Sequence, residues 1–145
     1  MTASRFAAVT AAMEVAHHVG DYMLQTDVQS ARKGARSDRL EECSEAESWT
    51  ALAGHVASYH VAQVAALVVA DRALGLKLRP GRVAAGVAIS AVTHAVIDRR
   101  WPVREWMDRA GARKFREHGG AAHVDQAMHR VSLFASALVI AGGAR

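Results

Sequence analysis

The chain has 145 residues, about the length of one domain. Hydrophobic residues make up 51% of it, aromatic residues only 6%, and the formal net charge is +4. The single cysteine, Cys43, excludes a disulfide within the chain. No run of β-branched residues alternates with polar residues, as strands would require, so the sequence predicts an all-α fold.

The expected architecture is one helical-bundle domain over residues 1–145, arranged as a four-helix up-down bundle. The four long helices are expected at residues 2–25, 48–75, 82–98 and 122–141. A charged connection at 30–47 precedes the second helix, and Ser48 is the expected N-cap of that helix. Pro102 interrupts the chain after the third helix, and residues 103–117 are expected to form a short amphipathic surface helix.

Three His/Asp pairs with helical spacing are the main functional signal: His17–Asp21, His94–Asp98 and Asp125–His129. Residues four positions apart share one face of a helix, so each pair presents a nitrogen and an oxygen side by side. In an up-down bundle the three pairs and His55 would lie at the same end. The sequence therefore predicts a metal site with seven candidate ligands, His17, Asp21, His55, His94, Asp98, Asp125 and His129.

The expected chemistry is hydrolysis by a metal-activated water. Imidazole and carboxylate ligands without a thiolate suit Zn, Mn, Fe or Ni, and seven ligands would serve one or two ions. Three aspartates are the expected catalytic residues, Asp21, Asp98 and Asp125. Four neighbouring side chains are expected to bind an anionic substrate such as a phosphoester, Gln25, Arg99, Arg100 and Gln126.

A non-catalytic function is the alternative. The same cluster can fix the register of the helices through hydrogen bonds, or handle ions, in a membrane or scaffold protein. Bound metal separates the two interpretations, because a register device needs none.

The expected location is a membrane, with the cytoplasm as the alternative. Residues 49–70 carry no charge and are long enough to span a bilayer, although the mean hydropathy of the chain is only +0.03. Basic residues are concentrated in the first and third connections, which places these and the polar site on the cytoplasmic side. The expected partner is an anionic small molecule or lipid, and no nucleic-acid motif is present.

Several motifs resemble the bacterial and phage family named domain of unknown function 3307. Residues 17–27 read H-x-x-x-D-x-x-L-Q-x-D, residues 93–98 read T-H-x-x-I-D, and residues 125–129 read D-Q-x-x-H. A lone histidine early in the second helix, here His55, also resembles that family. The resemblance implies a small multi-helix, membrane-associated protein, and it carries no established activity.

Overall fold

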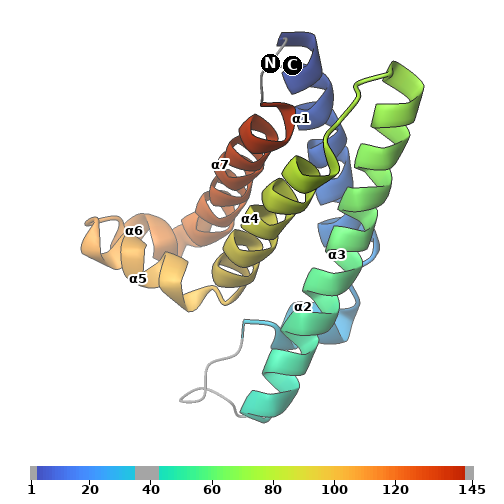
Figure 1. The fold of residues 1–145 in the computed structure, drawn as a ribbon. Coiled ribbons are helices and arrows are strands. Elements are labelled where there is room, and N and C mark those ends of the chain that lie inside the picture. Colours follow the sequence, from blue (N-terminus) through green and yellow to red (C-terminus); the bar gives the residue numbers. More distant parts are fainter. Residues whose placement is uncertain (1–2, 35–42, 143–145) are drawn as a thin grey trace.

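The computed structural model describes residues 3–34 and 43–142, and helices are the only regular elements within these ranges. The predicted all-α class is confirmed. Figure 1 shows four long helices side by side, α1 (Ala3–His18), α3 (Glu45–Leu74), α4 (Pro80–Asp98) and α7 (Ala121–Ala141). The start of α1 lies beside the end of α7. The shorter elements are η1 (Val19–Met23), α2 (Asp27–Arg32), α5 (Trp101–Arg109), α6 (Arg113–Phe115) and η3 (Arg116–Gly120).

The prediction of a single helix at 103–117 is wrong. The chain instead forms α5 and α6, which are separated by a turn at Gly111. Gly111 has a φ of 76°, in the left-handed region that glycine adopts at low cost. Pro102 is one of the first residues of α5, where a missing backbone N–H costs nothing.

One capping box corrects an expected helix start, and a second begins a helix that the sequence analysis did not expect. Ser44, and not Ser48, caps α3, because its side chain accepts a hydrogen bond from the backbone N–H of Glu47 and the Glu47 side chain accepts one from Ser44. Thr26 and Gln29 form the same motif at the start of α2. Part of the predicted connection 30–47 is therefore helical, and its residues 35–42 lie outside the described ranges.

The apolar core lies at the end of the bundle where α1 begins and α7 ends. Its largest buried members are Val9, Met13, Leu67, Leu133 and Ile140. Helix α4 packs against α7, α1 packs against both α3 and α7, and α3 also contacts α4. Gly86 of α4 makes the approach to α7 possible, because a Cβ there would meet the side chain of Ile140 and the backbone oxygen of Ser136.

Helices α3 and α4 are long and apolar enough to cross a membrane, a property shared by core helices of soluble proteins. Only 28% and 22% of their apolar windows are buried. Exposed apolar side chains on these two helices include Val61, Val69, Val92 and Val96.

We expect the contact between α4 and α7 to be intolerant of a side chain at position 86. Gly86→Val should lower the free energy of unfolding by about 1–3 kcal/mol, because overpacking forces the two helices apart. Urea denaturation measures the change. Gly81→Ala is the matched control, since a Cβ at Gly81 in the same helix meets nothing. Equal midpoints for the two variants would contradict this account of the packing.

Candidate metal centre

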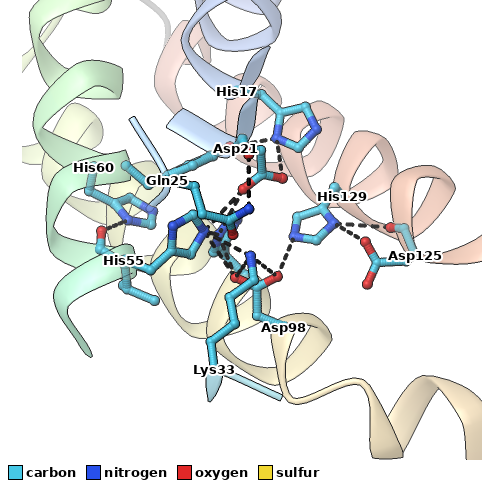
Figure 2. Close-up of polar contacts among 12 residues, drawn as sticks. His17, Asp21, Gln25, Lys33, His55, His60, Asp98, Asp125 and His129 are labelled. Atoms are coloured by element: carbon cyan, nitrogen blue, oxygen red, sulfur yellow. Dashed lines mark hydrogen bonds and ion pairs between the residues drawn. The ribbon is translucent and has the colours of Figure 1, made fainter. Parts of the chain in front are cut away.

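Four of the seven predicted ligands meet at the end of the bundle opposite the apolar core. Asp21 comes from η1, His55 from α3, and His94 and Asp98 from the last turns of α4. One ligand atom from each residue lies within 4.8 Å of the others, and all four residues are buried. Figure 2 shows the labelled members Asp21, His55 and Asp98 pointing toward one another. Sequence spacing and helix placement thus identified the members of this cluster.

A π-helical turn places Asp21 in the cluster. The α-helix α1 ends at His18, and the chain continues through η1, where a wider turn shifts the direction of the side chains. Gly20 packs against Tyr59 of α3 so closely that a Cβ at position 20 would overlap the ring. Gln25 then donates a hydrogen bond to the backbone oxygen of Asp21 at 3.2 Å. The end of α1 is therefore held tightly against α3.

The spacing of the four ligand atoms resembles the edges of a tetrahedron. His55 Nε2 lies 3.0 Å from Asp21 Oδ1, 3.1 Å from Asp98 Oδ2 and 3.1 Å from His94 Nε2. His94 Nε2 lies 3.0 Å from Asp98 Oδ2 and 3.6 Å from Asp21 Oδ1. Metal–ligand bonds of about 2.0–2.2 Å give tetrahedral edges of about 3.3–3.6 Å. The donor atoms therefore lie close to the arrangement that a single small cation requires.

The contacts around His55 Nε2 exceed what one proton can satisfy. A neutral imidazole nitrogen carries either one proton or one lone pair. His55 Nε2 nevertheless lies within 3.1 Å of two carboxylate oxygens, another imidazole nitrogen and the amine of Lys33. The Nδ1 atoms of His55 and His94 are buried and have no hydrogen-bond partner. A cation between the four donor atoms would interact favourably with all of them.

Lys33, which the sequence analysis missed, supplies a positive charge at this point. Its Nζ lies 2.9 Å from each oxygen of Asp98 and 3.1 Å from His55 Nε2, and the residue is 5% exposed. Figure 2 shows its side chain reaching Asp98. Lys33 follows α2 in a polar segment, where a lysine is normally solvated. The capping box at Thr26 was the only local signal that this segment is ordered.

His17 lies outside the group of four, and its role as a ligand stays a prediction. Its Nε2 donates to Gln126 Oε1 at 3.1 Å, and its Nδ1 accepts from the Tyr59 hydroxyl at 3.2 Å. Both ring nitrogens are therefore engaged. His17 Nδ1 also lies 3.5 Å from Asp21 Oδ2, so the residue packs behind the cluster.

Asp125 and His129 form a separate pair beside the cluster. His129 Nδ1 donates to the backbone oxygen of Asp125 at 3.0 Å and lies 3.3 Å from its carboxylate. The remaining ring nitrogen, Nε2, is buried without a hydrogen-bond partner and lies 3.9 Å from Asp98 Oδ1. Figure 2 shows His129 between Asp98 and Asp125. The predicted ligands Asp125 and His129 thus lie outside the group of four.

Burial and charge set the protonation of the cluster. Burial lowers the pKa of His94 to about 4, against the raising effect of Asp98. Burial alone would raise the pKa of Asp21 and Asp98, but hydrogen bonds from His55 and nearby positive charge outweigh it and hold both pKa values below the ordinary range. The two aspartates therefore stay ionised and His94 stays neutral, and these are the protonation states in which carboxylates and imidazoles bind metals.

The other two histidines behave differently. Burial would lower the pKa of His55, yet its hydrogen bonds to Asp21 and Asp98 raise it overall. Burial likewise opposes the charged form of His129, and Asp125 raises the pKa of that imidazole above its usual value. Among the three histidines of the two groups, His55 and His129 therefore hold a proton more strongly than His94 does.

A pocket of about 520 Å³ opens beside the cluster and reaches Asp21 and Asp98. Three of the four predicted substrate-binding residues line it, Gln25, Arg100 and Gln126. Arg99, the fourth, does not. Its guanidinium is buried, donates to Ser48 Oγ at 2.8 Å and stacks over Trp49 at 4.3 Å from the ring centroid. Arg99 thus joins α4 to α3, and its expected role in substrate binding stays a prediction.

The comparisons with known proteins leave the site to be interpreted from its own geometry. No family model matches the sequence, and neither a curated protein nor a solved structure matches it. The resemblance to domain of unknown function 3307 therefore stays a prediction from the motifs.

The pKa of His94 gives a testable pH dependence. Because the pKa falls from 6.5 to about 4 on folding, His94 contributes stability above pH 6.5 that is lost as the pH falls through 4. In metal-free protein at pH 6, we expect nitrogen NMR to report a neutral His94 ring, with the signal assigned from a His94→Gln variant. A ring that is half-protonated at pH 6 or above would contradict the buried environment described.

Proposed function

We propose that this protein is a metal-dependent hydrolase whose metal is bound by Asp21, His55, His94 and Asp98. The observation that carries the proposal is the convergence of these four donor atoms, all within 4.8 Å of one another, beside an open pocket. A bound divalent ion supplies a water of lowered pKa as a nucleophile and polarises the substrate. The four long helices serve as an up-down bundle that holds the ligands at one end.

The donor set limits the choice of ion. Two imidazoles and two carboxylates suit Zn, Mn, Fe or Ni, and the two aspartates balance the charge of a divalent ion. Four protein ligands complete a tetrahedral zinc shell, so water has room only where coordination exceeds four, as Mn²⁺ and Fe²⁺ allow. His129 lies where it can orient Asp98, because its Nε2 is 3.9 Å from Asp98 Oδ1 and its Nδ1 is held by Asp125. The predicted second ion has no comparable group of ligands among the described residues.

A structural cluster is the second candidate, and Lys33 favours it. The lysine amine bonds both oxygens of Asp98 and contacts His55, so it already supplies a cation to the buried carboxylates. A buried network of this kind can fix how helices pair without any catalytic role. The predicted membrane location, with this end toward the cytoplasm, is supported by the long apolar stretches of α3 and α4 and stays a prediction.

Metal binding tests the first proposal directly. The chain purified without a histidine tag should bind about one Mn²⁺ or Zn²⁺ in calorimetric titration. His94→Ala should abolish stoichiometric binding while circular dichroism shows unchanged helix content, because one of four donors is lost. His123→Ala is the control, since His123 is exposed on α7 and is not a member of the group of four. Full stoichiometry in His94→Ala would refute the proposed ligand set.

Lys33→Met separates the two candidates. If the cluster binds a metal, removing the nearby positive charge should leave the ion affinity unchanged or increase it, because the amine no longer repels the ion. If the cluster is structural, the same change breaks a buried ion pair and should lower the free energy of unfolding by about 3–5 kcal/mol, with no ion bound. Calorimetric metal titration and urea denaturation of the same preparation measure both effects.

A further inference from the structure

We propose that the pocket beside the metal cluster binds a phosphoryl group, held by Lys33, Arg100 and Arg104. This inference names the substrate class of the proposed hydrolase and rests on that function. The pocket has a volume of about 520 Å³, and these three basic side chains line it together with Asp21 and Asp98. An anion in the pocket would therefore adjoin both the basic side chains and the proposed metal ligands.

Arg104 is the basic residue most available to a ligand. Its guanidinium forms no hydrogen bond or ion pair with other residues of the described ranges 3–34 and 43–142. Three other arginines nearby are already paired. Arg109 binds Glu105 at 2.8 Å, Arg113 binds Glu117 at 2.9 Å and Arg116 binds Asp108 at 2.6 Å. Of the two arginines on α5, Arg109 is therefore paired with an acidic residue of the described ranges and Arg104 is not.

Arg100 is fixed at the edge of the pocket by its backbone and its side chain. Its φ of 58° is a left-handed conformation that residues other than glycine rarely adopt. Its guanidinium donates to the backbone oxygen of Ser30 at 3.0 Å. Its side chain lies against Gly34 so closely that a Cβ at position 34 would overlap it. One amino group of the guanidinium therefore binds α2, and the residue also lines the pocket.

The charges favour a phosphoryl group over a carboxylate. With a divalent ion bound, Asp21 and Asp98 balance the charge of the ion, and Lys33, Arg100 and Arg104 leave the pocket positive. Asp125 is directed toward His129. A phosphoryl dianion offers three oxygens to separate donors, and guanidinium groups bind such oxygens in pairs. The apolar part of the lining, Tyr22, Val103, Ala121 and Ala122, provides room for the organic part of an ester.

The reaction that such a site serves is hydrolysis of a phosphoester. The oxygen of water forms a bond to phosphorus, and the bond between phosphorus and the ester oxygen breaks. The alcohol leaves with one proton of the water, and the other remains on the phosphate or passes to a base. A small soluble phosphoester and a phospholipid headgroup share this phosphoryl chemistry, so the experiment distinguishes between them.

The experiment measures binding of inorganic phosphate by calorimetry to the full chain, with and without Mn²⁺. Arg104→Gln should weaken phosphate binding at least about tenfold and leave Mn²⁺ binding and helix content unchanged, because its side chain contacts no proposed ligand. Arg109→Gln is the matched control, as Arg109 lies on the same helix, is paired with Glu105 and does not line the pocket. A parallel arm compares sedimentation with vesicles containing phosphatidic acid and with phosphatidylcholine vesicles.

Binding of either phosphate or phosphatidic acid that depends on Arg104 supports the inference, and the probe that binds identifies the source of the phosphoryl group. Equal binding by wild type and Arg104→Gln, or no binding of either probe, overturns it. If Mn²⁺ binds at full stoichiometry in that case, the proposed metal centre survives the loss of the subsite. Conversely, phosphate binding that depends on Arg104 in a chain that binds no metal retains the subsite and refutes the metal-dependent hydrolase.

Discussion

Two buried carboxylates that lie close together are the constraint on which this end of the molecule depends. Asp21 and Asp98 are both less than a tenth exposed and contribute oxygens to the same group of atoms. Two like charges in a buried site repel each other and lose their hydration, so positive charge or protons must accompany them. His55, His94 and Lys33 surround them for this reason. Each of these residues comes from a different segment, so the electrostatic requirement of one site ties η1, α3, α4 and the end of α2 together.

The sequence predicted the parts of the fold and the site that follow from helical period. Spacing of four residues placed His94 and Asp98 on one face of a helix, and the order of the helices brought His55 and Asp21 to the same end. Period alone could not show that His17 contacts Tyr59 and Gln126, because these partners belong to α3 and α7, which are distant from His17 in the chain. The burial of Lys33 and Arg99 could not be predicted either, since it arises from contacts between segments distant in the chain.

The bundle divides its two ends between different kinds of interaction. The apolar end holds the helices together by burying large side chains such as Met13, Leu67 and Ile140, and Gly86 brings α4 close to α7 there. The polar end contains buried groups whose hydrogen bonds are incomplete, including nitrogens of His55, His94 and His129. Such groups reduce stability unless a ligand completes them. Burial of apolar side chains at one end therefore offsets the stability lost to incomplete hydrogen bonds at the other.

All three tryptophans of the chain lie at the polar end. Trp49 is near the start of α3 and lies under the guanidinium of Arg99, while Trp101 and Trp106 are exposed on α5. Arg99 directly follows Asp98 and is the residue that joins α4 to Trp49. The intrinsic tryptophan fluorescence of the protein consequently originates at the polar end. Changes in the surroundings of the polar end can thus be followed by tryptophan fluorescence without an added label.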